Sequence, residues 1–254
     1  MTPFEVVAIL LAGVAAGTIN TVVGSGTLIT FPTLLAFGVP PVTANVSNTI
    51  GLVPGSVSGA VGYRRELRGQ RSRVLRLCVA SLVGGTAGAL LLLRLPARAF
   101  TAIVPALILL GIVLVLFQPR ISAWVARRHE ALGGMPHHGT WWVWPGVLLT
   151  GVYGGYFGAA QGVLLMAVLG TGIDETLQRL NAVKNVLAAV VNAIAGLIFA
   201  FVADVDWRIV LLIGVGSLIG GQLGATVGRR LPAGVLRVVI VVVGLVALTV
   251  FLLS

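Results

Sequence analysis

Residues 13–34 read GVAAGTINTVVGSGTLITFPTL and lie within a mostly apolar region that runs from Phe4 to Phe37. One helix of that length would exceed the ~30 Å hydrocarbon core of a bilayer by about 15 Å or more, at 1.5 Å per residue. Gly24, Ser25 and Gly26 interrupt the region. Because of its length, this stretch predicts a broken helix or a re-entrant hairpin rather than a single straight span.

A second long apolar region has the same form. It runs from Trp141 to Gly170 and is interrupted at residues 158–162, which read GAAQG. Outside these two regions, six apolar stretches are each long enough for one membrane span. They are Ala44–Gly62, Val74–Leu93, Ala99–Phe117, Leu187–Val202, Ile209–Val227 and Val235–Leu253.

The composition agrees with a membrane protein and excludes several other classes. Of the 254 residues, 57% are hydrophobic and 9% are charged, whereas soluble domains carry about 25% charged residues. The apolar excess also excludes a disordered chain. One cysteine and three histidines exclude a disulfide scaffold and a cysteine metal cluster. We read the net charge of +10 as the basic cytoplasmic face of a membrane protein, so no nucleic acid is expected as a partner.

The two halves of the chain resemble each other. At shifts of 136 to 138 residues, segments of the first half match segments of the second. The matches include Gly17 with Gly155, Asn48 with Asn185, SLVGG at 81–85 with SLIGG at 217–221, and LPA at 95–97 with LPA at 231–233. We therefore predict a first transmembrane repeat at residues 1–117, a cytoplasmic linker at 118–140 and a second transmembrane repeat at 141–254.

The basic residues indicate how the two repeats are oriented. If each broken region crosses the membrane once, ten basic residues lie inside and seven outside. If each broken region returns to its starting side, 14 lie inside and only Arg94, Arg98 and Arg208 lie outside. Basic residues favour cytoplasmic loops, so the second arrangement is preferred. The predicted fold class is an all-α polytopic membrane protein of two inverted repeats, each starting with a broken or re-entrant helical segment, with both termini outside.

Inverted repeats around discontinuous helices are a recurring plan of secondary transporters, which hold their substrate near the midplane of the bilayer. A helix interrupted inside the membrane exposes backbone groups that a solute can satisfy, and its N-terminal end attracts anions. The candidate substrate-binding residues lie at the two breaks and near the start of the span that follows each break. They are Asn20, Thr21, Gly24, Ser25, Gly26, Thr27, Asn45, Ser47, Asn48, Gln161, Gly162, Asn181, Lys184, Asn185 and Asn192.

The charged residues favour an anion or a polar neutral solute. None of the seven acidic residues falls in the middle of a predicted span, where cation and proton carriers usually place carboxylates. A lysine inside the hydrocarbon is costly and usually functional, which favours a role for Lys184; the alternative is that it snorkels to the cytoplasmic surface. Asp174 and Glu175 follow the second break. A solvated turn is expected there, and a gating or proton-linked role stays open.

The motifs also carry a family resemblance. It rests on residues 13–34, GVP at 38–40, ANVSNT at 44–49, residues 151–162 and RLNAVKN at 179–185. In these motifs the sequence resembles the sulfite exporter TauE/SafE family of membrane transporters. The resemblance implies transport, in the direction of export, of small sulfur-containing oxyanions such as sulfite or organosulfonates across the cytoplasmic (inner) membrane. Ser25 and Thr27 stand where more glycine is expected, and their hydroxyls add donors for an oxyanion.

Other function classes have weaker support. An intramembrane serine protease would need a base near Ser25, but the three histidines lie in the predicted linker. A membrane scaffold or assembly factor without flux would not need polar residues at the breaks, and a carrier of another small anion or polar solute remains an alternative. We expect no enzyme activity, no cofactor and no metal. The expected partners are the anion and the lipid bilayer, and a homo-oligomer is compatible with these features.

Overall fold

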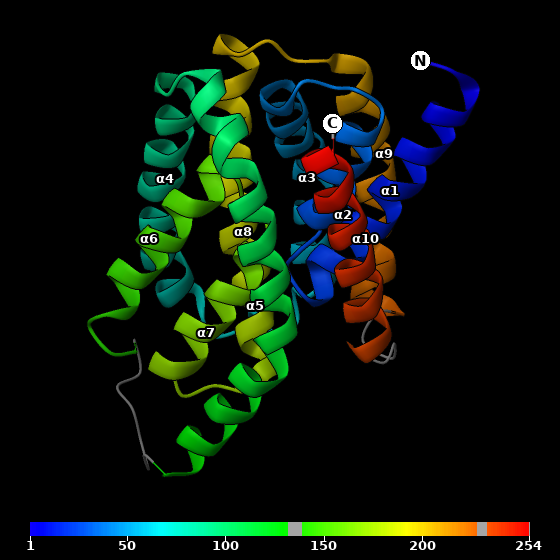
Figure 1. Cartoon of the computed structure of the whole chain (residues 1–254). Coiled ribbons are helices and arrows are strands. Elements are labelled where there is room, and N and C mark those ends of the chain that lie inside the picture. Colours follow the sequence, from blue (N-terminus) through cyan, green and yellow to red (C-terminus); the bar gives the residue numbers. More distant parts are fainter. Residues whose placement is uncertain (132–138, 228–232, 254) are drawn as a thin grey trace.

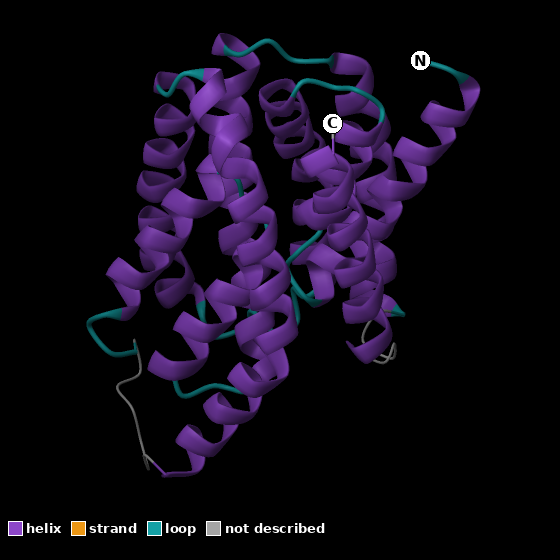
Figure 2. Ribbon diagram, in the orientation of Figure 1, coloured by secondary structure: helices purple, strands orange, loops and turns teal. Residues whose placement is uncertain are grey.

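The computed structural model describes residues 1–131, 139–227 and 233–253, and within these ranges the chain forms helices joined by loops and no strand (Figures 1 and 2). The helices are α1 (Pro3–Val22), α2 (Thr27–Ala36), α3 (Pro41–Gly62), α4 (Arg71–Arg94), α5 (Ala97–Ala131), α6 (Val143–Tyr156), α7 (Gln161–Gly172), α8 (Leu177–Val202), α9 (Trp207–Thr226) and α10 (Ala233–Leu253). The predicted all-α class is therefore confirmed.

Several of these helices can cross a membrane. Within the described residues, five are both long and apolar enough: α1, α4, α5 as far as Ile121, α8 and α9. Large apolar side chains such as Leu149, Phe201 and Leu211 point outward with more than half of their surface exposed. An outer surface of this kind needs lipid rather than water around it. The prediction of a polytopic membrane protein is confirmed.

The interruptions lie at the predicted places. Helix α1 ends at Val22 and α2 begins at Thr27, while α6 ends at Tyr156 and α7 begins at Gln161. Each pair forms a helical hairpin in Figure 1. The start of α1 and the α2–α3 connection lie at the upper end of the molecule. The start of α6 and the α7–α8 connection lie at the lower end. The two hairpins therefore enter the molecule from opposite ends.

Two helix boundaries differ from the prediction. Helix α8 begins at Leu177 rather than Leu187, because Thr176 caps its first turn and the polar side chains that follow, Asn181, Lys184 and Asn185, are buried within the protein. A search for apolar stretches misses the beginning of such a helix, because its polar side chains have hydrogen-bond partners within the protein. Helix α5 continues past Phe117 to Ala131, so most of the polar stretch taken as a linker is helical. Residues 132–138 of that stretch lie outside the part of the chain that the structure describes.

The helices of one half pack mainly on helices of the other half. Helix α1 packs against α9, and correspondingly α6 packs against α4. Helix α2 packs against α10, and correspondingly α7 packs against α5. Helices α3 and α8 pack against each other. Every one of these pairs has a counterpart when α1–α5 are exchanged with α6–α10. Such a pattern is what a two-fold relation between the halves would produce. It supports the predicted duplication, whose boundaries stay a prediction.

Small residues allow this interlocking. A Cβ added at Gly17 of α1 would lie 2.3 Å from the Ser217 carbonyl oxygen on α9. A Cβ added at Gly155 of α6 would lie 2.3 Å from the Gly85 carbonyl oxygen on α4. Close backbone approach of this kind is how helices associate in membranes, where apolar side chains gain little by leaving lipid. Gly17 and Gly155 were matched positions of the sequence repeat, so the two contacts are counterparts.

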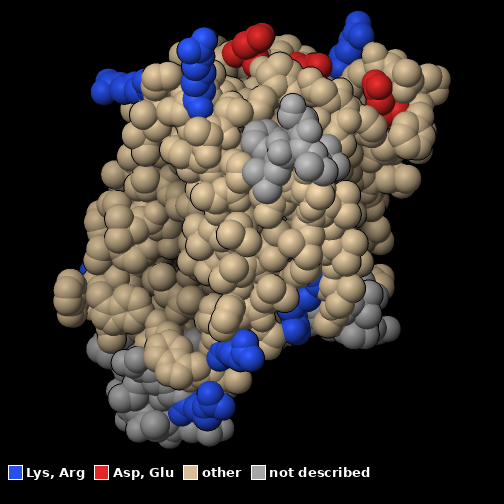
Figure 3. Space-filling view, in the orientation of Figure 1, with Lys and Arg blue, Asp and Glu red and all other residues tan. Residues whose placement is uncertain are grey.

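The two ends of the molecule differ in charge. The acidic side chains visible in Figure 3 gather at the upper end, together with some basic ones, whereas the basic side chains visible at the lower end have no acidic neighbours on that face. The upper end holds the α4–α5 and α8–α9 connections, and the lower end holds the α3–α4 and α7–α8 connections (Figure 1). The basic stretch from Arg64 to Arg76 belongs to the lower end. Basic residues favour the cytoplasm, so this pattern agrees with the predicted orientation, in which the lower end is cytoplasmic; the orientation stays a prediction.

Candidate functional site

The two helix breaks touch each other. The Gly162 N–H at the start of α7 donates a hydrogen bond of 2.9 Å to the Gly24 carbonyl oxygen. Gly24 has a positive φ of 90°, and a Cβ placed on it would lie 2.3 Å from Gly162 Cα. Only glycine tolerates both that backbone conformation and that approach. The first turns of α2 and α7 therefore start from one point inside the molecule.

The last carbonyl groups of α1 are held by three side chains of α8. Lys184 Nζ donates to the carbonyl oxygens of Asn20 and Thr21, both at 3.1 Å. Asn181 and Asn185 donate to the same Thr21 oxygen at 3.2 and 3.3 Å. Lys184, the sole lysine of the chain, has 0% of its surface exposed. Its amine is thus fixed at the end of α1 inside the protein, and the snorkelling alternative does not hold.

The end of α6 is satisfied in a corresponding way. Asn45 of α3 donates from Nδ2 to the Tyr156 carbonyl oxygen at 3.0 Å. The C-terminal carbonyls of a helix carry partial negative charge, and an amide or ammonium donor compensates it. Each broken segment therefore has its negative helix end capped by polar side chains of the central helices α3 and α8.

Further polar side chains connect α2, α3, α1 and α8. The Thr30 hydroxyl donates to Asn48 Oδ1 at 2.5 Å, and Asn48 Nδ2 donates to Thr27 Oγ1 at 3.4 Å. Asn20 and Asn192 both donate to Ser56 Oγ, at 3.4 and 3.0 Å. The sequence reasoning did not select Ser56 or Thr30 as site residues. Ser56 lies eight residues, about two turns, after Asn48, and this spacing could have indicated it.

Within the described part of the chain, three polar atoms of the predicted site residues have no hydrogen-bond partner. They are Ser25 Oγ in the first break, Gln161 Nε2 at the start of α7 and Asn45 Oδ1 on α3. All three side chains are buried, with 0, 4 and 0% of their surface exposed. An unsatisfied buried polar group costs about 1–3 kcal/mol, so such groups call for an explanation. A polar solute bound between the breaks would provide one.

Most predicted site residues surround this point, but one does not. All of them are buried apart from Asn20, which is half-buried. Ser47 uses its hydroxyl elsewhere: its Oγ accepts a 3.0 Å hydrogen bond from the Asp206 N–H in the α8–α9 connection. Ser47 therefore anchors a loop at the upper end. The remaining candidates lie on the breaks or on the faces of α1, α3 and α8 that meet them.

The electrostatic sign of this centre is positive. The N-termini of α2 and α7 each carry partial positive charge, and they start at touching breaks. The opposing negative ends of α1 and α6 are compensated by donors, and Lys184 adds an amine. The acidic residues whose side chains the structure describes all lie in terminal turns or connections between helices. The centre is thus suited to an anion.

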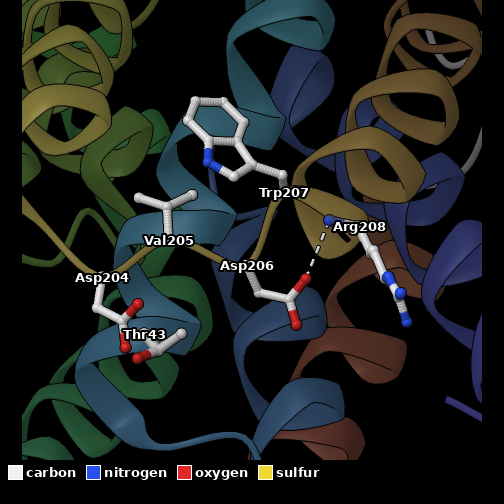
Figure 4. Close-up of a pocket in the computed structure, with 6 residues that line it drawn as sticks. All are labelled: Thr43, Asp204, Val205, Asp206, Trp207 and Arg208. Carbon is white, nitrogen blue, oxygen red and sulfur yellow. Dashed lines mark hydrogen bonds between the residues drawn. The ribbon is translucent and has the colours of Figure 1, made fainter.

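A depression opens separately at the upper end of the molecule. It has a volume of about 490 Å³ and is lined by Thr43 of α3 and by residues 204–208 at the start of α9 (Figure 4). Asp206 caps α9, because its Oδ1 accepts from the N–H groups of Arg208 and Ile209 at 2.9 and 3.2 Å. Thr43, which lines the depression, precedes Asn45 by two residues of α3.

An all-helical membrane fold in which two interrupted helices meet at a buried polar centre is typical of secondary transporters. The chain belongs to the sulfite exporter TauE/SafE family of membrane transporters, whose family model matches residues 9–251. The predicted family resemblance is confirmed, and it covers nearly the whole chain.

Curated relatives are similar over almost their full length. A "probable membrane transporter protein ORF9" of Sinorhizobium is 28% identical over 99% of this chain and 94% of its own length. The "probable membrane transporter protein YfcA" of Escherichia coli K12 is 26% identical over 97% of this chain and 89% of its own. A Haemophilus influenzae protein described in the same words is 25% identical over 87% and 84%. No solved structure gives a significant match.

Proposed function

We propose that this transporter carries a small sulfur-containing oxyanion, such as sulfite or an organosulfonate, across the cytoplasmic membrane. The observation that carries the proposal is the buried centre, where two helix N-termini touch and Lys184 caps the adjoining end of α1, with no acidic partner among the described side chains. The description of the family supports the sulfur chemistry. The anion would lie against Gly24–Thr27 and Gln161, whose unpartnered polar atoms it would satisfy.

The side chains divide the work of binding. Lys184 contributes an amine at the centre, and its hydrogen bonds to α1 keep it from turning away. Ser25 and Gln161 offer donors to the oxygen atoms of the substrate, while the glycines let the backbone come close. Asn45 Oδ1 accepts hydrogen bonds only, so it suits a substrate that also carries a proton, such as a singly protonated oxyanion. Movement of one half against the other would open the centre to each side in turn.

The proposal predicts a strict dependence on the amine of Lys184. In proteoliposomes that take up labelled sulfite, Lys184→Met should reduce flux by about 100-fold, since a charged hydrogen bond to the substrate is worth roughly 3 kcal/mol. Arg208→Met removes a cation from the rim of the upper depression and is the matched control, with flux within about twofold of the parent. Thermal unfolding of both variants shows whether the fold is kept. Full sulfite flux in a folded Lys184→Met protein would remove the lysine from the mechanism.

Competition experiments test the substrate class. Unlabelled taurine, sulfoacetate, sulfate and chloride are added to the same uptake assay. The proposal expects competition from at least one sulfur oxyanion and none from chloride. Absence of flux for every anion, from folded protein and under both a pH gradient and a voltage, would favour the alternatives of a neutral solute or of a scaffold without flux.

A further inference from the structure

A cluster of ionic contacts joins the two halves at the lower end. The Glu175 carboxylate, in the α7–α8 connection, accepts from Arg73 Nη1 of α4 at 3.0 Å. Its second oxygen accepts from Arg179 Nε of α8 at 2.6 Å. One carboxylate thus holds two guanidinium groups, one from each half of the chain. We call these three residues the ionic bridge.

The ionic bridge is anchored on both sides. Arg73 also donates to Gln70 Oε1 at 2.8 Å, and Arg179 donates to the Arg68 carbonyl oxygen at 3.2 Å. The side chains of Arg73, Glu175 and Arg179 expose 5, 19 and 31% of their surface. Partial burial and charge-assisted geometry make such a network stronger than an exposed surface pair. The α3–α4 connection is therefore fastened to the start of α8.

The ionic bridge lies between the central site and the lower end. Arg179 precedes Lys184 by five residues of the same helix, a rise of about 8 Å. Asn181, between them, already contacts the end of α1. A solute that moved from the site to the lower end along α8 would have to pass where Arg179 and Glu175 meet the α3–α4 connection.

Among the described residues, the corresponding place at the upper end has no ion pair between the halves. In the correspondence between the halves, the α8–α9 connection is the counterpart of the α3–α4 connection. The start of α3 is the counterpart of the start of α8. There, Thr43 and residues 204–208 line the open depression of about 490 Å³ (Figure 4). The Asp206 carboxylate caps α9 instead of forming an ion pair with the other half. The α8–α9 connection is joined to α3 by the hydrogen bond from the Asp206 N–H to Ser47 Oγ. The lower end is thus joined by ion pairs between side chains, whereas the upper end carries an open depression.

We propose that the ionic bridge of Arg73, Glu175 and Arg179 is the gate that closes the transport site toward the lower, cytoplasmic end. The structure then represents the conformation that is closed inside and faces outward. Opening toward the cytoplasm separates the α3–α4 connection from the start of α8 and breaks the contact between Arg73 and Glu175. The gate rests on the proposed transport function, although its closure can be measured without any substrate.

The test measures access to the site from each side of the membrane. A single cysteine is placed at Asn181 in a Cys78→Ala background, and a membrane-impermeant thiol reagent is applied to inside-out and to right-side-out vesicles. Glu175→Gln should raise labelling from the cytoplasmic side about tenfold, because it removes the charge that holds both arginines. Asp174→Asn removes the neighbouring exposed carboxylate and should leave labelling unchanged.

A second pair of variants separates the gate from a general loss of packing. Arg73→Gln should act like Glu175→Gln, whereas Arg71→Gln, an exposed arginine of the same helical turn, should not. The exchange Arg73→Glu with Glu175→Arg should restore slow labelling if the ion pair itself closes the site. Equal cytoplasmic labelling in Glu175→Gln and Asp174→Asn would overturn the gate. Because labelling needs no substrate, a failure of sulfite transport would leave this result interpretable.

Discussion

At the scale of single residues, Lys184 shows how a polar side chain is accommodated inside a membrane protein. Its apolar stem crosses the interior while its amine meets two backbone carbonyls that α1 cannot satisfy by itself. The break in α1 thus supplies acceptors for the lysine, and the lysine supplies a donor for the break. Each would be costly without the other, which explains why a broken helix and a buried lysine occur together here.

Gly24 is the residue whose substitution the structure constrains most. Gly24→Ala must overcome both a positive φ and a contact of 2.3 Å with Gly162 Cα. Gly38→Ala is the matched control, since Gly38 has a φ of 76° but nothing within 4 Å of an added Cβ. The control should cost about 1 kcal/mol of stability, the penalty for the backbone conformation alone. Gly24→Ala should unfold at a clearly lower temperature and lose flux.

The measurement is thermal unfolding of the detergent-solubilised protein, followed by uptake in proteoliposomes. If both alanine variants unfold at the same temperature, the contact between the breaks is looser than described. Gly24 would then be required for its backbone conformation only.

At the scale of elements, the hairpin of α6 and α7 ends beside the ionic bridge. Burial by itself would raise the pKa of the Glu175 carboxyl, but the hydrogen bonds and charges of Arg179 and Arg73 outweigh burial and hold the pKa below its ordinary value. A carboxylate with a lowered pKa contributes stability at neutral pH, and the contribution is lost as the pH falls through the folded-state pKa. The bridge should therefore stay closed at neutral and mildly acidic pH.

This expectation can be checked with the same accessibility assay. Cytoplasmic labelling of the cysteine at position 181 should stay constant from about pH 8 to pH 5 and rise only below the ordinary glutamate pKa of about 4.3. In Glu175→Gln the low-pH rise should be absent, because the titrating group is gone. A rise between pH 6 and pH 7 would point to a group other than Glu175. Thiol reactivity itself changes with pH, so each rate is divided by that of the Glu175→Gln variant at the same pH, which lacks the titrating carboxylate.

At the scale of the whole molecule, the two hairpins enter from opposite ends and meet at the centre. Helices of one half complete the surroundings of the other, as α9 does for α1 and α4 for α6. Neither half could bury its own polar break alone. Stability and the transport site consequently depend on the same interlocking.

The topology gives a prediction at this scale. Single cysteines at Arg98 and Arg65, both exposed, should be labelled from opposite sides of the membrane. We expect the cysteine at position 98 to react from outside and that at position 65 to react from the cytoplasm, because the lower end holds the basic stretch. A Ser254 reporter fusion should read as external. Labelling of both positions from one side would contradict the inverted arrangement.

Much of the fold could be predicted from the sequence because it depends on local properties. The excess of apolar residues indicated a membrane protein. The apolar regions 4–37 and 141–170 are too long for one straight span each, so interruptions were expected, and the glycines indicated where they lie. The expectation of an anion or a polar neutral solute as substrate followed from the placement of Lys184 and of the acidic residues. Each of these inferences uses only residues that are near one another in the chain.

Only the tertiary structure decided which residues meet. The contact of Lys184 with Asn20 and Thr21 spans more than 160 positions of sequence. Ser47 also acts at long range, because its hydroxyl accepts from the N–H of Asp206 in the α8–α9 connection, 159 positions away, instead of serving the site. Glu175, expected on a solvated turn, lies between two arginines. The physical reason is that hydropathy and glycine spacing fix where a helix begins and breaks, whereas the partner of a buried polar group depends on how distant helices pack.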